Sequence, residues 1–115
     1  MKKTEYIDTM KNKDWKLDVL IQKWASNQIS AISGQKAECG HHIISRSNHY
    51  LRWDKENILP CTIQEHDLIH RGILKVDNYV SPKRMGNLIS KRADSLRWKP
   101  TEEFYEQKEK ELKKW

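Results

Sequence analysis

The sequence predicts an α+β fold, mostly helical, in which a short antiparallel hairpin and one helix form the centre and further helices flank both ends. Three observations predict it. Two short isoleucine-rich runs lie at residues 39–45 and 57–61, a helix-capping motif begins at Thr62, and helical signals precede and follow this stretch. A chain of 115 residues suits a single domain, residues 1–115, with a modest core.

The composition is polar but still that of a folded protein. Hydrophobic residues make up 37% of the chain and charged residues 33%, while five Trp and four Tyr remain to fill a core. We therefore expect a small core that carries long, charged helical extensions.

The N-terminal segment, residues 1–36, is expected to supply one structural helix. Residues 1–12 are polar and are expected to fray. Over residues 14–32, Asp14 is a suitable N-cap and Gly34 a suitable stop. The apolar residues that recur there at helical spacing are Leu17, Leu20, Ile21, Trp24, Ala31 and Ile32.

The central segment, residues 37–72, reads as a hairpin followed by a helix. The runs 39–45 and 57–61 are joined by a polar, loop-like stretch, which favours two antiparallel strands with a long connection. Thr62 and Glu65 then form the T-x-x-E pattern of a capping box, and Gly72 supplies a stop. This predicts a helix from about Ile63 to Arg71.

The C-terminal segment, residues 73–115, is expected to be a basic helical extension. Ser81-Pro82 reads as an N-cap followed by proline at the first helical position, and predicts a helix to about Trp98 that Gly86 weakens. Pro100-Thr101 begins a last helix that we expect to reach Trp115.

The charge balance favours a polyanionic partner. Lys and Arg number 22 against 16 Asp and Glu, a formal net charge of +6, which suits DNA, RNA or an acidic membrane surface. The excess gathers between residues 81 and 100, although a solvated helix face has about equal weight there. The basic residues of this stretch are Lys83, Arg84, Lys91, Arg92, Arg97 and Lys99.

The sequence argues against a membrane protein and against a four-cysteine zinc site. The N-terminal lysines are followed by no apolar stretch, and no run approaches the ~20 apolar residues that span a bilayer, so we expect a cytoplasmic protein without membrane association. The two cysteines, Cys39 and Cys61, are too few for a four-cysteine zinc site. We expect them to be free, partly buried thiols.

Four of the five histidines form a chemically sensible pattern. His66 and His70 lie four residues apart on the predicted helix, so both rings project from one face, where they can grip one metal ion. Alone, such a pair is more often two ordinary surface histidines. His41 and His42 are neighbours in the first strand and should point to opposite faces, one toward the metal and one toward a substrate. Alone, they equally fit a polar strand edge.

The order of these elements gives the pattern its specificity. A His-His strand, a loop, Asn57 opening a return strand, and two histidines on a helix make up the ββα-metal arrangement. The segment AECGHHIISRSNHYLRWDKENILPCTIQEHDLIHRG, residues 37–72, resembles the HNH nuclease family, and its spacing matches the colicin-type DNase domains. A looser likeness to phage recombination nucleases of the NinG/Rap type implies a phage or prophage origin and branched-DNA substrates.

The resemblance implies a metal-dependent DNA endonuclease that hydrolyses phosphodiester bonds. It implies that His41, His66 and His70 hold one divalent ion, that His42 is the general base, and that Asn57 braces the loop and orients this base. Three imidazoles suit Zn²⁺, Ni²⁺, Co²⁺ or Mn²⁺ better than Mg²⁺. Many family members carry two C-x-x-C pairs around a second, structural zinc, which is not expected here because Cys39 and Cys61 stand alone.

Several basic residues are expected to contact DNA, the proposed partner. Arginine suits bidentate contact with phosphate, so the residues expected at DNA are Arg46, Arg52, Arg71, Lys83, Arg84, Lys91 and Arg92. A solvated surface role is about as probable for each arginine alone. Trp53 is expected to pack in the core, and Trp98 and Trp115 are candidates for a homodimer contact. The alternative to an enzyme is a non-catalytic, metal-stabilised module that binds nucleic acid.

Overall fold

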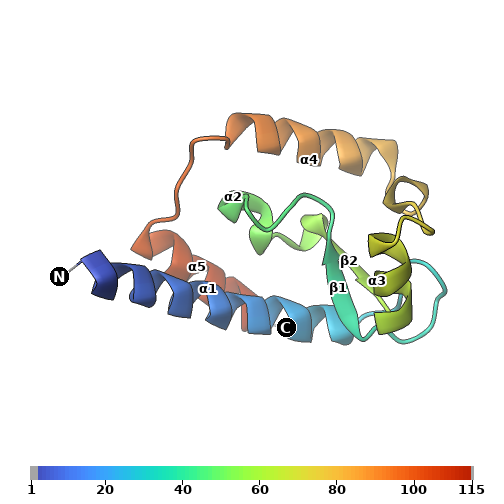
Figure 1. Cartoon of the computed structure of the whole chain (residues 1–115), viewed down its shortest axis with the longest axis horizontal. Coiled ribbons are helices and arrows are strands. Elements are labelled where there is room, and N and C mark those ends of the chain that lie inside the picture. Colours follow the sequence, from blue (N-terminus) through green and yellow to red (C-terminus); the bar gives the residue numbers. More distant parts are fainter. Residues whose placement is uncertain (1–2, 115) are drawn as a thin grey trace.

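The computed structural model describes residues 3–114, and side chains from residue 11 onward. It is a small α+β fold in which helices surround one two-stranded antiparallel sheet (Figure 1). The elements are α1 (Lys3–Ser26), β1 (Cys39–His42), α2 (His49–Arg52), β2 (Ile58–Cys61), α3 (Ile63–His70), α4 (Pro82–Asp94) and α5 (Glu102–Leu112). Two single turns of 3₁₀-helix, η1 (Lys55–Asn57) and η2 (Val76–Asn78), lie in the connections.

The main core lies between α1, α5 and the hairpin. Leu17, Ile21 and Ala25 form the buried stripe of α1, because they recur at helical spacing, and they pack with Trp53 and Ile58. Burial of Trp53 confirms the packing role that the sequence predicts for it. A second, smaller cluster joins the loop after β1 to α4 through Ile44, Leu51 and Leu88.

The predicted bounds of the first helix are wrong. The fraying predicted for residues 1–12 is not found in residues 3–12, which are helical, and residues 1 and 2 lie outside the described residues. The helix ends at Ser26 rather than near Gly34. Asp14 lies inside α1 instead of capping it, and its carboxylate accepts a hydrogen bond from the Tyr105 hydroxyl at 2.6 Å. Gly34 does adopt a positive φ of 76°, but in a turn within the loop that follows the helix.

The sheet confirms the predicted antiparallel hairpin and shortens its strands. His41 lies opposite Leu59, and Cys39 opposite Cys61. Beyond His42 the pairing continues by one bond, from the Ile43 amide to the Asn57 carbonyl at 2.9 Å. The connection, expected to be a plain loop, contains α2 and η1.

A close contact fixes β1 on α1. A Cβ atom at Gly40 would collide with Ile58 and would lie 2.9 Å from the Ala25 side chain, so only glycine permits this approach. The Gln22 side chain donates to the Gly40 carbonyl at 3.0 Å and accepts from the Gly40 amide at 2.8 Å. Strand β1 is thereby attached to the helix by backbone packing and by two hydrogen bonds.

Helix α3 starts and stops where the sequence predicts. The Thr62 hydroxyl accepts from the Glu65 amide at 3.1 Å, and Glu65 accepts from the Thr62 amide at 2.8 Å. Gly72 follows the helix with a φ of 74°. Glu65 also accepts from the Ser30 hydroxyl at 2.6 Å. Burial acts to raise the pKa of Glu65, but these hydrogen bonds outweigh it and leave the pKa lowered.

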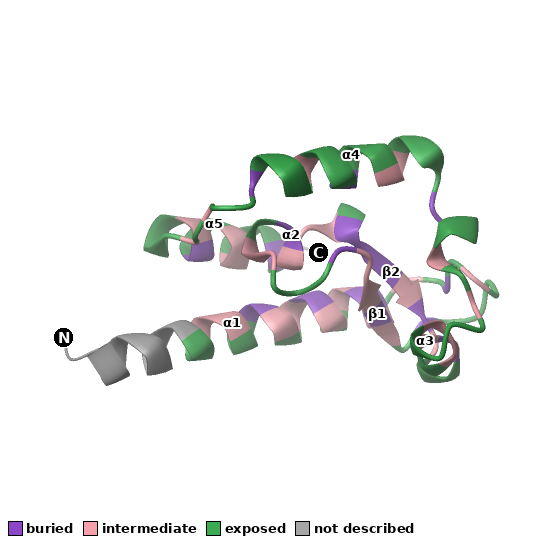
Figure 2. Ribbon diagram, turned by 45° about the horizontal axis from the view of Figure 1, so that its top comes forward, coloured by how far each residue is buried: buried purple, intermediate pink, exposed green. Residues whose placement is uncertain are grey.

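Helices α4 and α5 begin as predicted and end earlier. The Ser81 hydroxyl caps α4, with Pro82 in its first turn, but the helix ends at Asp94 rather than near Trp98. Helix α5 ends at Leu112. Of the two candidates for a homodimer contact, Trp98 is half-buried and Trp115 lies outside the described residues. Much of α4 is exposed on its outer side (Figure 2). No helix in residues 3–114 is long and apolar enough to cross a bilayer.

Candidate metal centre

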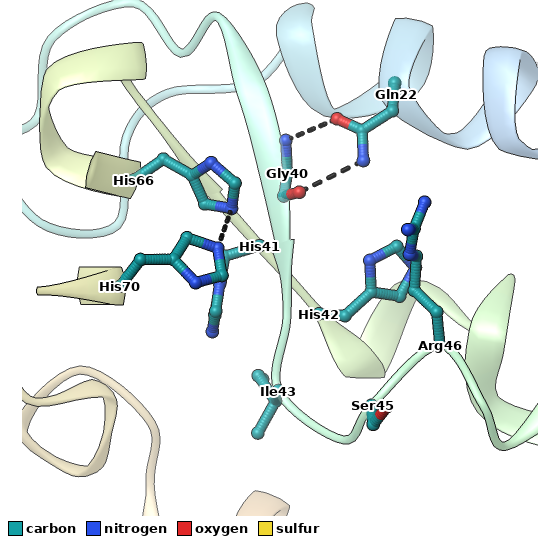
Figure 3. Close-up of a pocket in the computed structure, with 9 residues that line it drawn as sticks. All are labelled: Gln22, Gly40, His41, His42, Ile43, Ser45, Arg46, His66 and His70. Carbon is teal, nitrogen blue, oxygen red and sulfur yellow. Dashed lines mark hydrogen bonds between the residues drawn. The ribbon is translucent and has the colours of Figure 1, made fainter. Parts of the chain in front are cut away.

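Three histidines from two elements converge on one point. His41 comes from β1, while His66 and His70 come from adjacent turns of α3 (Figure 3). One ring nitrogen from each lies within 4.8 Å of the others. The ring centroids are 5.3 Å apart for His41–His66 and for His41–His70, and 4.4 Å apart for His66–His70. The helical spacing of four residues and the packing of α3 beside β1 produce this arrangement.

Two details of the cluster suit a cation. The Nε2 atoms of His66 and His70 lie 3.0 Å apart, close to the ~3.3 Å between two imidazole ligands of one tetrahedral ion with bonds of 2.0–2.1 Å. Within the described part of the chain, Nδ1 of His41 is buried without a hydrogen-bond partner. Buried polar atoms nearly always have a partner, so a bound ion is a physical explanation for this one.

The electrostatics keep the cluster in its ligand form. Burial, followed by the nearby rings of His66 and His70, lowers the pKa of His41 from 6.5 to about 4. Burial and His70 also lower the pKa of His66. Neutral imidazole is the form that binds metals, so at neutral pH these two rings need to release no proton to bind an ion.

His42 lies on the opposite side of β1 from the cluster, as strand geometry predicts (Figure 3). Its Nε2 lies 2.8 Å from the backbone carbonyl of Arg52. Burial lowers the pKa of His42, although the Arg52 carbonyl and Asp18 act in the opposite direction. The ring is therefore held in one orientation and is neutral near pH 7.

Asn57 connects the parts of the structure that position His42. Its side chain is fully buried, accepts from the Ile44 amide at 2.7 Å, and donates to the carbonyls of Ile44 and Leu51 at 3.0 Å each. It therefore ties the end of β1 to α2, whose last residue, Arg52, supplies the carbonyl that holds His42. This agrees with the predicted bracing of the loop by Asn57.

Both sides of β1 open onto one pocket of about 630 Å³. The residues that line it are Gln22, Gly40, His41, His42, Ile43, Ser45, Arg46, His66 and His70. Sequence reasoning missed Gln22 and Ser45. Gln22 had no signal, since it is one polar residue on a long helix and only tertiary packing brings it to β1. Ser45 lies in an exposed turn without a distinguishing motif.

The structure brings one of the predicted phosphate-binding residues, Arg46, into the pocket. Arg52 instead donates to both carboxylate oxygens of Asp18, at 2.9 and 2.6 Å, and these bonds raise its pKa. Arg71 lies at the surface 3.4 Å from Asp67. Of these three arginines, Arg46 lines the pocket, and Arg52 and Arg71 do not.

The predicted basic residues of α4 lie away from the pocket. Arg84 donates to the backbone carbonyls of Glu56 and Ile58 at 2.7 and 2.9 Å, which attaches α4 to the hairpin. Lys91 lies 3.3 Å from Asp54. Lys83 and Arg92 are exposed. The structure thus gives two of these four residues intramolecular partners and leaves two facing solvent.

The two cysteines lie side by side across the hairpin as free thiols. Their Sγ atoms are 3.9 Å apart. Burial raises the pKa of Cys39, and burial together with Cys39 raises the pKa of Cys61 to about 12. Both thiols therefore remain protonated at neutral pH. Their free state and their burial agree with the predicted partly buried thiols.

Comparisons with protein families, curated proteins and solved structures found no match to this chain. The resemblance to HNH nucleases accordingly rests on the motif in residues 37–72.

Proposed function

We propose that this protein is a metal-dependent DNA endonuclease of the HNH type, in which β1, β2 and α3 form a ββα-metal core. One observation carries the proposal: His41 reaches the His66–His70 pair from a different element, so that three ring nitrogens lie within 4.8 Å. Two histidines on one helix are common without function, because ligation needs a further donor from elsewhere, and here His41 of β1 is placed to supply it.

His41, His66 and His70 are the proposed ligands of one divalent ion. Three protein ligands leave coordination positions for a substrate, and imidazole favours Zn²⁺, Ni²⁺, Co²⁺ or Mn²⁺. When bound, such an ion supplies Lewis-acid stabilisation of the charge that develops on the phosphate. The buried, unpartnered Nδ1 of His41 supports this assignment.

His42 is the proposed general base. A carbonyl oxygen only accepts hydrogen bonds, so the Arg52 carbonyl requires the ring hydrogen to be on Nε2 and leaves the lone pair on Nδ1. Nδ1 can then take a proton from the attacking water, and the carbonyl stabilises the positive ring that results. A base in this position contributes typically 10²–10⁴-fold to the rate.

Arg46 is the proposed phosphate-binding residue. It is exposed at the pocket, and within the described part of the chain no hydrogen bond or ion pair engages its guanidinium group. Its charge acts on His42 and lowers the pKa of that ring, which places the two groups near each other. A guanidinium there can pair two N–H groups with phosphate oxygens and orient the scissile bond beside His42.

Nicking of supercoiled plasmid tests the proposal. The full chain is freed of metal, then assayed with Mn²⁺, Ni²⁺, Zn²⁺ or Mg²⁺ and again with excess chelator. We expect nicking that requires a metal and stops with chelator. A protein that binds metal and DNA but nicks with none of these ions is the non-catalytic binding module instead, and a protein that binds no stoichiometric metal contradicts the whole site.

A further inference from the structure

An exposed tryptophan, Trp15, lies on α1 two helical turns before the residue of this helix that lines the pocket. Trp15 has 70% of its surface exposed, and Val19, one turn further, has 46% exposed. Gln22, which lines the pocket, follows Trp15 by seven residues. Seven residues are two helical turns with a rotation of only about 20°, so both side chains lie on nearly the same face, about 10 Å apart along the helix.

Neither core packing nor ion pairing accounts for Trp15. The core face of α1 is formed by Leu17, Ile21 and Ala25. Another face is paired with α5, through Lys13 with Glu102 at 3.3 Å and Lys16 with Glu109 at 2.6 Å. The indole and Val19 therefore form a small apolar surface that lies on the same side of α1 as Gln22, the residue of this helix that lines the pocket, and is turned away from both contacts.

The charges beside this surface suit a nucleic-acid strand. Among the residues whose side chains the structure describes, Asp18 lies beside this face of α1; it already binds the Arg52 guanidinium and accepts from the Trp53 indole at 2.9 Å. Its negative charge is thus compensated. Exposed Lys11 lies one turn beyond Trp15, and Arg46 lies at the pocket end. The phosphate backbone of a nucleic-acid strand that runs along α1 would therefore meet a cation at each end of the apolar surface.

We propose that Trp15 stacks on an unpaired base of the bound strand. The ~10 Å between Trp15 and Gln22 along the helix corresponds to roughly three nucleotides of a strand whose bases stack at ~3.4 Å. Base faces inside a duplex are covered by their neighbours, so only a single-stranded segment can offer one to the indole. The inference rests on the proposed function and narrows its substrate: strands with a single-stranded segment beside the cleavage position bind more tightly than continuous duplex.

Fluorescence anisotropy tests this without cleavage. A fluorescein-labelled dT12 strand and a 12-base-pair duplex are titrated with the metal-loaded full chain carrying His42→Ala, and in a second arm with the unmodified chain in chelator. Trp15→Ala is expected to weaken dT12 binding roughly 5- to 100-fold, more than duplex binding, while Trp15→Phe retains most of the affinity. Ile29→Ala is the matched control, because Ile29 is also 69% exposed and does not line the pocket.

Several results would overturn the inference. They are equal effects of Trp15→Ala and Ile29→Ala on dT12, an absence of dT12 binding, or a self-association that Trp15→Ala abolishes without changing dT12 affinity. Failure of the two proposals is distinguishable. Metal-dependent nicking with Trp15-independent dT12 binding rejects only the stacking role, whereas Trp15-dependent binding without nicking rejects only the nuclease.

Discussion

The imidazole of His42 is hydrogen-bonded through Nε2 to the backbone carbonyl of Arg52 at 2.8 Å, across ten residues of sequence. The carbonyl belongs to the last residue of α2, which Asn57 fixes to the end of β1. The tautomer of His42 is therefore determined by backbone geometry and does not depend on a second titratable side chain. The proposed base thus has its orientation and its proton position set before any substrate binds.

Replacing His42 with alanine is expected to lower the nicking rate by roughly 10²–10⁴-fold and to leave the metal content unchanged. The reason is that His42 lies across β1 from the three proposed ligands. Single-turnover nicking and metal analysis of the same preparation measure the two effects. Loss of metal together with activity would show that His42 belongs to the ligand set instead.

Replacing His66 with alanine is expected to reduce bound metal from about one equivalent to a small fraction, because two imidazoles hold an ion far more weakly than three. Isothermal titration with Zn²⁺ measures the loss. His49→Ala is the matched control, since His49 lies outside the cluster and pairs with Asp14 at 3.1 Å. Equal stoichiometry in the two variants would remove His66 from the site.

Replacing Gly40 with alanine is expected to destabilise the protein by about 1–3 kcal/mol, because the new methyl group collides with Ile58 and crowds Ala25. Gly86→Ala is the control, since Gly86 lies in α4 with nothing within 4 Å of the added atom, and a stabilisation of about 0.4–1 kcal/mol is expected there. Urea unfolding measures both, and a neutral Gly40 variant would contradict the close packing of β1 on α1.

Replacing Glu109 with glutamine tests a contact between α1 and α5. Hydrogen bonds from Lys113 at 2.7 Å and Lys16 at 2.6 Å lower the pKa of Glu109 from 4.5 to about 2. A depressed carboxyl pKa stabilises the folded state above pH ~4.5, and this stabilisation is lost as the pH falls toward 2. At pH 7 the free energy of unfolding of the wild type should exceed that of the variant by less than about 1 kcal/mol, because the two ion pairs are at the surface.

Urea unfolding at pH 7, 4 and 2 follows this difference, which should shrink and vanish across the acid range. A difference that stays constant down to pH 2 would show that the two lysines act through packing and not through the charge of Glu109.

Local signals in the sequence predict the part of the fold that carries the helix ligands. The capping box of Thr62 and Glu65 needs only residues three apart, and Gly72 marks the end of the helix, so α3 could be placed correctly. The facing of His41 and His42 follows from strand geometry alone. These local rules are sufficient to expect a cluster, although the meeting of His41 with α3 depends on how the hairpin and helix pack.

Long-range contacts account for the expectations that were wrong or incomplete. Asp14 has the chemistry of an N-cap, yet it bonds to Tyr105, 91 residues away. Arg52 is basic and close to the motif, yet Asp18, 34 residues earlier, engages its guanidinium. Neither pairing leaves a periodic or short-range signal, so the sequence alone could not separate these residues from a cap and a free phosphate ligand.

The amide of Gln22 occupies the place that a neighbouring peptide group would take in a wider sheet. By meeting both the N–H and the C=O of Gly40, it satisfies the outward-facing polar groups of β1 at this position. Unpaired strand edges recruit strands from other chains and so promote aggregation. At this position helix α1 thus blocks intermolecular β-pairing by β1, while His41 and His42 still line the pocket.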